Sequence, residues 1–313
     1  MTDATSLSPA ATAQRLPYVP LSEAIADVLR DDSVRVPPRL VERLSNGGSL
    51  FVMPAHDHAM AITKLITFVA DNAARRLPSI QGDIVVFDVT TGRRIGLLDG
   101  PTVTARRTAA VSLLAAQRLA PQPDGPLLIV GAGVQGRAHL EAFHAGLGTT
   151  TVRVASRSVA SADALVAHAR ALGMDAERVE DANRALADCP LVVTSTSAQV
   201  VCMRSPPRED AFVAAVGAFT PQMVEWAPNV CLQLAERGTV VVDTRDADHE
   251  AGDLLQAGLD VTTLPALADV VRDAPAWTDH PRRHGPVMFK SCGWAGWDLA
   301  AARCALQGLS SAL

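Results

Sequence analysis

Apolar and polar residues follow two different patterns along the chain, and the first covers residues 21–120. In residues 21–31, LSEAIADVLRD, the apolar positions have helical spacing, which predicts a helix with Ser22 as its N-cap. The segments SLFVMPA, MAITKLITFVA and DIVVFDVTTGRRIGLLDG are short, rich in β-branched residues and separated by turns. They predict a meander of mostly antiparallel strands. The segment TVTARRTAAVSLLAAQRLA lacks glycine and proline and predicts a long helix that ends before Pro121.

The second pattern starts after PQPDGP, residues 121–126, where strand-like and helical segments begin to alternate. The expected strands are LLIVGAG, TVRVAS, LVVTSTS, FVAAVGA and TVVVD, with helices through Phe143 and Ala171 after the first two. This alternation is typical of βαβ units and a parallel sheet. From Met288 onward, the segment FKSCGWAGWDLAAARCALQGL predicts a closing helix that packs on the first part of the chain. We therefore expect an α/β protein in which residues 121–287 are inserted into a discontinuous domain of residues 1–120 plus 288–313.

Composition excludes several classes of protein. Of the 313 residues, 48% are hydrophobic and 19% are charged, which indicates a globular chain. The net charge of -5 gives no basic surface for nucleic acid, and the longest apolar runs are too short to span a bilayer. The N-terminal segment has no signal-peptide pattern, and the five cysteines form no CxxC pair. We expect a cytoplasmic protein with reduced thiols and no nucleic-acid or membrane partner.

A glycine-rich motif, G-x-G-x-x-G, lies directly after the apolar strand LLIV and directly before a helix. Gly131 permits the tight turn, Gly133 lets the backbone approach a pyrophosphate, and Gly136 lets the helix pack closely on the strand. Val134 and Gln135 complete the motif at the helix N-terminus, where free N–H groups and the helix dipole favour a phosphate. A glycine-rich turn without a ligand is the alternative, but the position between strand and helix favours a dinucleotide site.

The end of the second strand in this series favours NADPH over NADH. An NAD site usually has an acid here that binds the ribose 2′-hydroxyl, but no acid lies between residues 149 and 162. The strand instead runs into Ser156, Arg157 and Ser158, a cation with two hydroxyls that suits a 2′-phosphate. The alternative is a solvated arginine at the start of a loop.

Several further stretches point to a known family. They are VPPR at 36–39, MPA at 53–55, AITKLIT around Lys64, RRTAAVS at 106–112, STS at 195–197, VGAFTP at 216–221 and FKSCGWAGWDLA at 289–300. With the glycine motif, these stretches resemble the ornithine cyclodeaminase/μ-crystallin family over nearly the whole chain. The resemblance implies a Rossmann domain joined to a substrate-binding and dimerisation domain built from both termini, and therefore a homodimer.

The resemblance also implies site residues. Arg39, Lys64 and Arg107 fall on positions that hold a substrate carboxylate, and Thr196 of the STS stretch falls in the cofactor site. Arginine binds a desolvated carboxylate through two parallel hydrogen bonds, and lysine adds a mobile charge or a proton. For a single basic residue a surface salt bridge is the ordinary alternative. Three cations at matching positions favour a carboxylate site.

Phe219 occupies the position that is an aspartate in ornithine cyclodeaminases, where that acid serves the ring-closing deamination. A phenylalanine cannot transfer a proton, but it can line a pocket for an apolar ring and exclude water. An alternative is that Phe219 only packs under its loop. The neighbouring Thr220 either hydrogen-bonds the imine nitrogen or the nicotinamide amide, or caps local backbone before Pro221.

The sequence thus predicts an NADPH-dependent enzyme, with NADH less favoured, that reduces cyclic ketimines. The resemblance implies 1-pyrroline-2-carboxylate or 1-piperideine-2-carboxylate as substrate and L-proline or L-pipecolate as product. Three rivals remain. They are an ornithine cyclodeaminase-type lyase, an alanine dehydrogenase-like oxidoreductase and a crystallin-like protein that only binds NADPH.

Weaker patterns remain at a few positions. His56 and His58 are two residues apart, but no further ligand completes a metal site, so a polar loop is expected and no metal. Asp243 ends a predicted strand and serves either the site or the next turn. Trp294 and Trp297 are expected to pack at a domain or dimer junction.

Asp298 lies in the predicted closing helix. We expect it to start or cap this helix rather than to take part in the chemistry.

Overall fold

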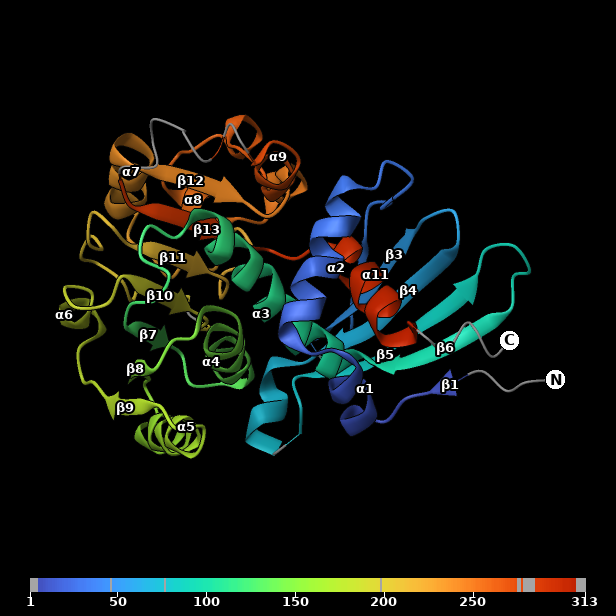
Figure 1. The fold of residues 1–313 in the computed structure, drawn as a ribbon, viewed down its shortest axis with the longest axis horizontal. Helices are drawn as coiled ribbons and strands as arrows, with labels where there is room; N and C mark the ends of the chain where they lie inside the picture. The colour runs from blue at the N-terminus through green and yellow to red at the C-terminus, as the bar shows by residue number, and fades with distance from the viewer. Residues whose placement is uncertain are drawn as a thin grey trace. The chain divides into compact units, whose positions relative to one another are not determined.

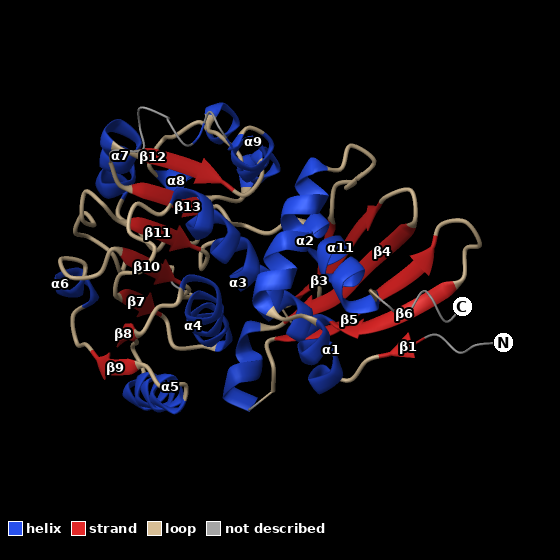
Figure 2. Cartoon of the chain, viewed as in Figure 1, coloured by secondary structure: helices blue, strands red, loops and turns tan. Residues whose placement is uncertain are grey.

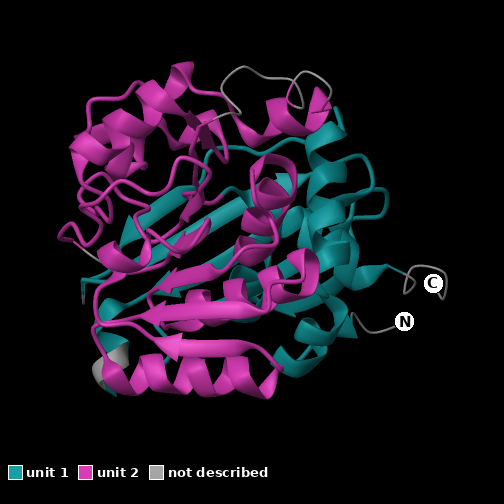
Figure 3. Ribbon diagram, turned by 60° about the vertical axis from the view of Figure 1, so that its left-hand side comes forward, with its two compact units in different colours: residues 1–107, 294–313 teal, residues 108–293 magenta. Residues whose placement is uncertain are grey.

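The chain forms two compact units, and unit 1 is discontinuous (Figure 3). This computed structural model describes residues 5–45, 47–75, 77–197, 199–274, 277 and 285–307. Unit 1 comprises residues 1–107 and 294–313, and unit 2 comprises residues 108–293. The sequence patterns place the corresponding boundaries at 120/121 and 287/288. Each unit is described by itself below.

Unit 1 is built on a six-stranded sheet in the order β1-β6-β5-β4-β3-β2 (Figures 1 and 2). All neighbours are antiparallel except β1 and β6, so the predicted meander is confirmed. The strands are β1 Thr5–Ser6, β2 Leu40–Arg43, β3 Ser49–His56, β4 Met60–Phe68, β5 Ile80–Asp88 and β6 Arg94–Asp99.

Helices of unit 1 cover one face of this sheet. They are α1 Pro9–Arg15, α2 Tyr18–Arg30, the 3-10 helix η1 Ala70–Arg75, the start of α3 Gly100–Leu119, and α11 Ala295–Leu306. Helix α11 contacts α2, β3 and β4, as expected for the C-terminal helix (Figure 1). Side chains on the covered face, such as Ile62 and Ile84, are buried. On the other face Leu65 is 46% exposed and Phe87 is 37% exposed, so apolar side chains remain on the surface of the chain.

The predicted N-cap at Ser22 is wrong, because α2 begins one turn earlier at Tyr18 with Pro17 as its N-cap. Proline is well tolerated at a helix start, where backbone N–H groups have no intrahelical partner. The apolar face also extends back to Tyr18, whose buried ring lies 3.9 Å from the Arg106 guanidinium. Ser22 is therefore inside the helix, and its hydroxyl donates to the Val19 carbonyl at 2.8 Å.

Unit 2 contains a seven-stranded sheet in the order β12-β13-β11-β10-β7-β8-β9. Every neighbouring pair is parallel, which confirms the predicted α/β class with a Rossmann-type sheet. The strands are β7 Leu127–Val130, β8 Thr151–Ala155, β9 Asp175–Arg178, β10 Leu191–Thr194, β11 Phe212–Ala215, β12 Thr239–Val242 and β13 Val287–Lys290.

Helices connect the parallel strands of unit 2, and the rest of the predicted long helix α3 precedes them (Figure 2). They are α4 Val134–Leu147, α5 Val159–Ala171, α6 Ala182–Ala185, α7 Pro228–Arg237, α8 Gly252–Gln256 and α9 Leu267–Arg272, with the 3-10 helices η2 Arg245–His249 and η3 Val261–Thr263. One core layer includes the fully buried Leu128, Val192, Val213 and Trp226. No helix in the described part of the chain combines the length and apolar character needed to span a membrane.

The predicted closing helix is wrong over its first residues, because Val287–Lys290 form strand β13. This strand lies between β11 and β12, and all four of its residues are buried. A short apolar run buried on both faces has no periodicity that separates strand from helix. The helical part starts only at Ala295 and ends at Leu306.

Strand β7 is the topological switch point of unit 2. The chain continues from β7 to β8 and β9 on one side, and returns to β10 and β11 on the other. Loops that leave neighbouring strands in opposite directions open a crevice at the carboxyl ends, where ligands bind in such sheets. The glycine motif follows β7 and the STS stretch follows β10. The fold therefore puts two predicted cofactor segments at the switch point.

Two glycines of the motif should respond differently to alanine. A Cβ at Gly136 would lie 2.0 Å from the Gly131 carbonyl oxygen, whereas a Cβ at Gly133 would meet nothing within 4 Å. Gly136→Ala should therefore lower the free energy of unfolding by about 1–3 kcal/mol through overpacking. Gly133→Ala, the matched control, should cost less than about 1 kcal/mol. Denaturant unfolding of both variants measures this, and equal losses would contradict the close packing at Gly136.

Candidate active site

The glycine motif forms a turn that leaves a helix N-terminus open. Gly131 has a φ of 107°, and a Cβ there would lie 2.7 Å from the Ser195 carbonyl oxygen. Gly133 is the N-cap of α4 and has no side chain that could cap the first N–H groups of the helix. Val134 is 71% exposed and Gln135 is partly exposed. The first N–H groups of α4 can therefore bind a phosphate, as a pyrophosphate site requires.

The loop after β8 presents a cation beside a second helix N-terminus. Arg157 is exposed, and the described residues provide no carboxylate that pairs with it. Ser158 is the N-cap of α5, and its hydroxyl accepts a hydrogen bond from the Ser161 N–H at 3.2 Å. The Ser156 hydroxyl accepts one from the Ser158 N–H at 3.3 Å. The loop combines an available guanidinium with a helix dipole, which suits a bound phosphate.

Two further predicted segments leave the same edge of the sheet. Thr196 follows β10, and both its N–H and its hydroxyl donate to the Glu225 carboxylate, at 2.7 and 2.9 Å. Phe219 and Thr220 follow β11, and both side chains are partly exposed. Because β10 and β11 pair in parallel, both segments begin at the carboxyl edge. No motif or periodicity in the sequence distinguishes Glu225, so the sequence analysis did not identify this residue.

In unit 1, buried cations gather around one carboxylate. Lys64 on β4 is 1% exposed, and its Nζ lies 2.7 Å from Asp298 Oδ2. Arg107 on α3 is 6% exposed, and its Nε donates to Asp298 Oδ1 at 3.3 Å. Arg39 precedes β2 and is partly exposed, with its guanidinium 5.9 Å from the centre of the Phe51 ring. The three cations outnumber the single acid, so the cluster has a net positive charge.

The sequence analysis expected Asp298 only to start or cap the closing helix, and it did not predict the ion pairs of this side chain. Asp298 does lie in the first turn of α11, where a negative charge is favourable. Its side chain is fully buried, however, and it forms ion pairs with both Lys64 and Arg107. These partners are 234 and 191 residues away in sequence, and no local pattern reports such a contact. The FKS–G–D pattern of the family was the only available signal.

The environment of Lys64 lowers the pKa of its ammonium group to about 8. Burial is the largest cause, because it disfavours the charged form, and the Asp298 carboxylate opposes it. The positive charges of Arg107 and Arg39 lower the pKa further. Lys64 is therefore expected to lose its proton at a lower pH than an ordinary surface lysine.

The other sequence candidates have structural contacts. Asp243 Oδ2 accepts hydrogen bonds from Ser291 Oγ and from the N–H groups of Cys292 and Gly293, so it fixes the turn after β13. Burial raises the pKa of the Asp243 carboxyl.

The Ser33 hydroxyl lies 3.2 Å from His58 Nδ1. Within the described ranges, no group of three histidine, cysteine, aspartate or glutamate side chains could hold a metal ion.

The two tryptophans pack against each other in unit 1. The ring centres of Trp294 and Trp297 are 4.8 Å apart in an edge-to-face arrangement, and Trp297 is fully buried. Whether they also pack at a dimer junction stays a prediction.

Comparison with known proteins gives consistent matches. The chain is 38% identical over 296 residues to Delta(1)-pyrroline-2-carboxylate reductase 1 of Burkholderia multivorans, covering 93% of this chain and 90% of the relative. It is 31% identical over 300 residues to ketimine reductase mu-crystallin of Rattus norvegicus, covering 93% and 91%.

A solved structure supports the fold. Thermococcus litoralis Delta(1)-pyrroline-2-carboxylate reductase in complex with NADH and L-proline matches with a TM-score of 0.88 at 23% identity, covering 98% of both chains. The profile of the ornithine cyclodeaminase/mu-crystallin family matches residues 16–311. This chain therefore belongs to the ornithine cyclodeaminase/mu-crystallin family.

Proposed function

We propose that this chain is an NADPH-dependent reductase of cyclic ketimines. The substrate is 1-pyrroline-2-carboxylate or 1-piperideine-2-carboxylate, and the product is L-proline or L-pipecolate. The observation that carries the proposal is the cation cluster of Arg39, Lys64 and Arg107 around the buried Asp298. A relative named as a Delta(1)-pyrroline-2-carboxylate reductase, at 38% identity, and one named as a reductase of both imines, at 37%, support it.

The cation cluster would bind the substrate carboxylate. Asp298 fixes Lys64 and Arg107 before substrate arrives, so little side-chain freedom is lost on binding. Arg107 uses Nε toward Asp298, which leaves the other guanidinium nitrogens for the substrate. A carboxylate that leaves water requires such charged donors, because the desolvation cost is otherwise too high.

The residues of unit 2 fit a bound dinucleotide. Gly131, Gly133 and Gly136 and the open N-terminus of α4 would hold the pyrophosphate. Arg157, with Ser156 and Ser158 beside it, would hold the 2′-phosphate of NADPH, and NADH would lack this contact. When bound, the reduced nicotinamide supplies hydride to the imine carbon.

The remaining task of the protein is to protonate the imine nitrogen, or to bind the substrate as the iminium, and to exclude water. Phe219 would line the pocket for the saturated ring, and Thr220 would hydrogen-bond the imine nitrogen or the nicotinamide amide. Without an acid at 219, the site has no group there for ring-closing deamination. The imine nitrogen gains one proton and the carbon gains hydride, which completes the reduction to the cyclic amine.

A homodimer is part of the proposal. One face of the unit 1 sheet carries exposed apolar side chains on three strands, namely Leu40, Leu65 and Phe87. Exposed apolar side chains gathered on one face of a sheet are typical of an interface between protein subunits. The archaeal alanine dehydrogenase dimer, which matches with a TM-score of 0.87 at 20% identity, supports the fold comparison only.

One assay separates the proposed function from its rivals. NADPH oxidation is followed with each cyclic imine, and ammonia release is measured with ornithine and NAD. The proposal expects rapid oxidation with an imine and no ammonia from ornithine. Ammonia release would identify a lyase, and NADPH binding without turnover of either imine would leave the alanine dehydrogenase-like enzyme and the binding protein as the two alternatives.

Cofactor preference should depend on Arg157. Arg157→Ala should reduce the preference for NADPH over NADH, measured as the ratio of kcat/KM values, by about 1.5–3 kcal/mol because one charged contact is lost. NADH kinetics serve as the control and should hardly change. A wild type that uses both cofactors equally would remove the 2′-phosphate assignment.

Activity should fall as pH rises through the pKa of Lys64. Below about pH 8 Lys64 is an ammonium and binds the substrate carboxylate, and above it the neutral amine does not. The plot of kcat/KM against pH should therefore have a falling limb near pH 8 in the wild type. In Lys64→Arg this limb should be absent or shifted strongly upward, because guanidinium stays charged. The same limb in both proteins would assign it to another group, such as the imine itself.

The role of Phe219 can be tested with two substitutions. Phe219→Asp should lower kcat/KM for imine reduction by roughly 10- to 100-fold through water entry and lost shape, without creating deaminase activity. Phe219→Leu keeps the pocket apolar and should be much milder. Steady-state kinetics with NADPH and the cyclic imine measure both. If aspartate is tolerated as well as leucine, Phe219 only packs under its loop.

A further inference from the structure

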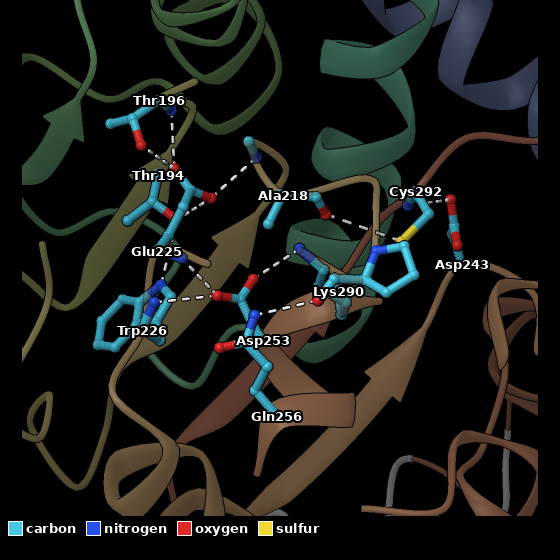
Figure 4. Close-up of polar contacts among 12 residues, drawn as sticks. Thr194, Thr196, Ala218, Glu225, Trp226, Asp243, Asp253, Gln256, Lys290 and Cys292 are labelled. Atoms are coloured by element: carbon cyan, nitrogen blue, oxygen red, sulfur yellow. Dashed lines mark hydrogen bonds and ion pairs between the residues drawn. The ribbon is translucent and has the colours of Figure 1, made fainter. Parts of the chain in front are cut away.

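The carboxylate of Glu225 connects two separate turns of unit 2. Its Oε1 accepts hydrogen bonds from the N–H and hydroxyl of Thr196, at 2.7 and 2.9 Å. Its Oε2 accepts from the Gly217 N–H at 2.8 Å and from the Thr194 hydroxyl at 3.0 Å. Thr196 belongs to the turn 195–197 after β10, and Gly217 to the turn 216–221 after β11. One side chain thus binds the main chain of both turns (Figure 4).

The two turns are also in direct contact at Gly217. A Cβ at this position would lie 2.2 Å from the Thr196 carbonyl oxygen and 2.4 Å from Glu225 Oε1. Only glycine lets its N–H reach the carboxylate while the backbone passes this close. The hydrogen bonds and the contact together fix the spacing between the turns.

The backbone at Glu225 is itself held by Asp253, which forms a buried ion pair with Lys290. Asp253 Oδ1 accepts hydrogen bonds from the N–H groups of Glu225 and Trp226, at 2.6 and 3.0 Å. Asp253 Oδ2 pairs with Lys290 Nζ at 2.7 Å, and all three charged side chains are buried (Figure 4). The backbone at residue 225 is therefore anchored to α8 and β13, and its side chain has little freedom.

Glu225 cannot serve as an acid or base in the reaction. Its side chain is fully buried, and each carboxylate oxygen already accepts two hydrogen bonds. Burial, together with the nearby Asp253 charge, raises the pKa of Glu225, while the N–H donors of both turns stabilise its charged form. Replacing a buried carboxylate that accepts this many hydrogen bonds leaves its donors unpaired and lowers stability. Because its N–H donors belong to the turns after β10 and β11, these two turns are what Glu225 holds in place.

We propose that Glu225 is the positioning residue that holds the cofactor-side turn 195–197 and the substrate-side turn 216–221 as one rigid element. It acts through Thr196 on the dinucleotide and through Gly217 on Phe219, two residues further along. The proposal rests on the proposed function only in assigning Thr196 and Phe219 to the two ligands. Loosening one turn should therefore loosen the other.

Glu225→Gln tests this, because an amide keeps the size of the side chain but presents NH₂ to two of the four donors. Hydrogen exchange of the folded protein should rise by about tenfold or more in peptides that contain Thr196 and in those that contain Gly217. KM for NADPH and KM for the imine should rise together by about tenfold each. Glu225→Asp keeps the charge but shortens the side chain, and should also loosen both turns.

Thr194→Val is the matched control. It removes one donor to the same carboxylate and the acceptor of the Trp226 Nε1–H, so it lowers stability without touching the N–H of either turn. Exchange in both turns should stay near the wild-type rate in this variant. A purely structural Glu225 would lower Tm with unchanged exchange in the turns and unchanged KM values.

The proposal is overturned if either turn keeps its protection in Glu225→Gln, or if Thr194→Val loosens both turns to the same degree. Because exchange is measured without substrate, it is independent of the reaction. If the wild type reduces neither imine while both turns loosen together, the proposed function fails and the positioning role of Glu225 stands.

Discussion

The parallel register of the unit 2 sheet is the constraint on which the proposed dinucleotide site depends. Ala155, Val130, Thr194, Ala215 and Lys290 are paired in one continuous row across β8, β7, β10, β11 and β13. Each strand ends at this row, so every following turn starts at the same edge. The strand register thus brings turns that are far apart in sequence to one edge of the sheet.

In unit 1 the corresponding constraint is electrostatic. Asp298 is fully buried, and an isolated buried carboxylate would be strongly destabilising. Lys64 and Arg107 offset this cost, and the acid in turn keeps two buried cations from repelling each other. The arrangement retains net positive charge for an anionic ligand. If the cluster binds a carboxylate as proposed, stability and ligand affinity share the same charges, and neither can be changed alone.

The parts of this architecture that sequence alone predicted are those with local signals. The glycine motif lies within a single turn, so its residues are neighbours in the sequence. The meander and the βαβ alternation follow from the hydrophobic periodicity of short segments. Strand β13 was missed because four buried apolar residues have no distinguishing period. The buried contacts of Asp298 and Glu225 were not predicted, because they involve partners brought near only by the tertiary fold. Glu225 in QMVEW resembles any surface glutamate, yet it is completely buried.

The close contact at Gly217 has a consequence for how such a protein can diverge. Gly217 and Glu225 determine the path of the backbone, whereas the side chain of Phe219 extends from that path and remains partly exposed. If Phe219 lines the substrate pocket as proposed, a substitution at 219 changes the chemistry offered to a ligand without requiring the main chain to move. Evolution, or a designer who varies substrate range, can exchange residues 219 and 220 on a scaffold whose geometry is inherited unchanged.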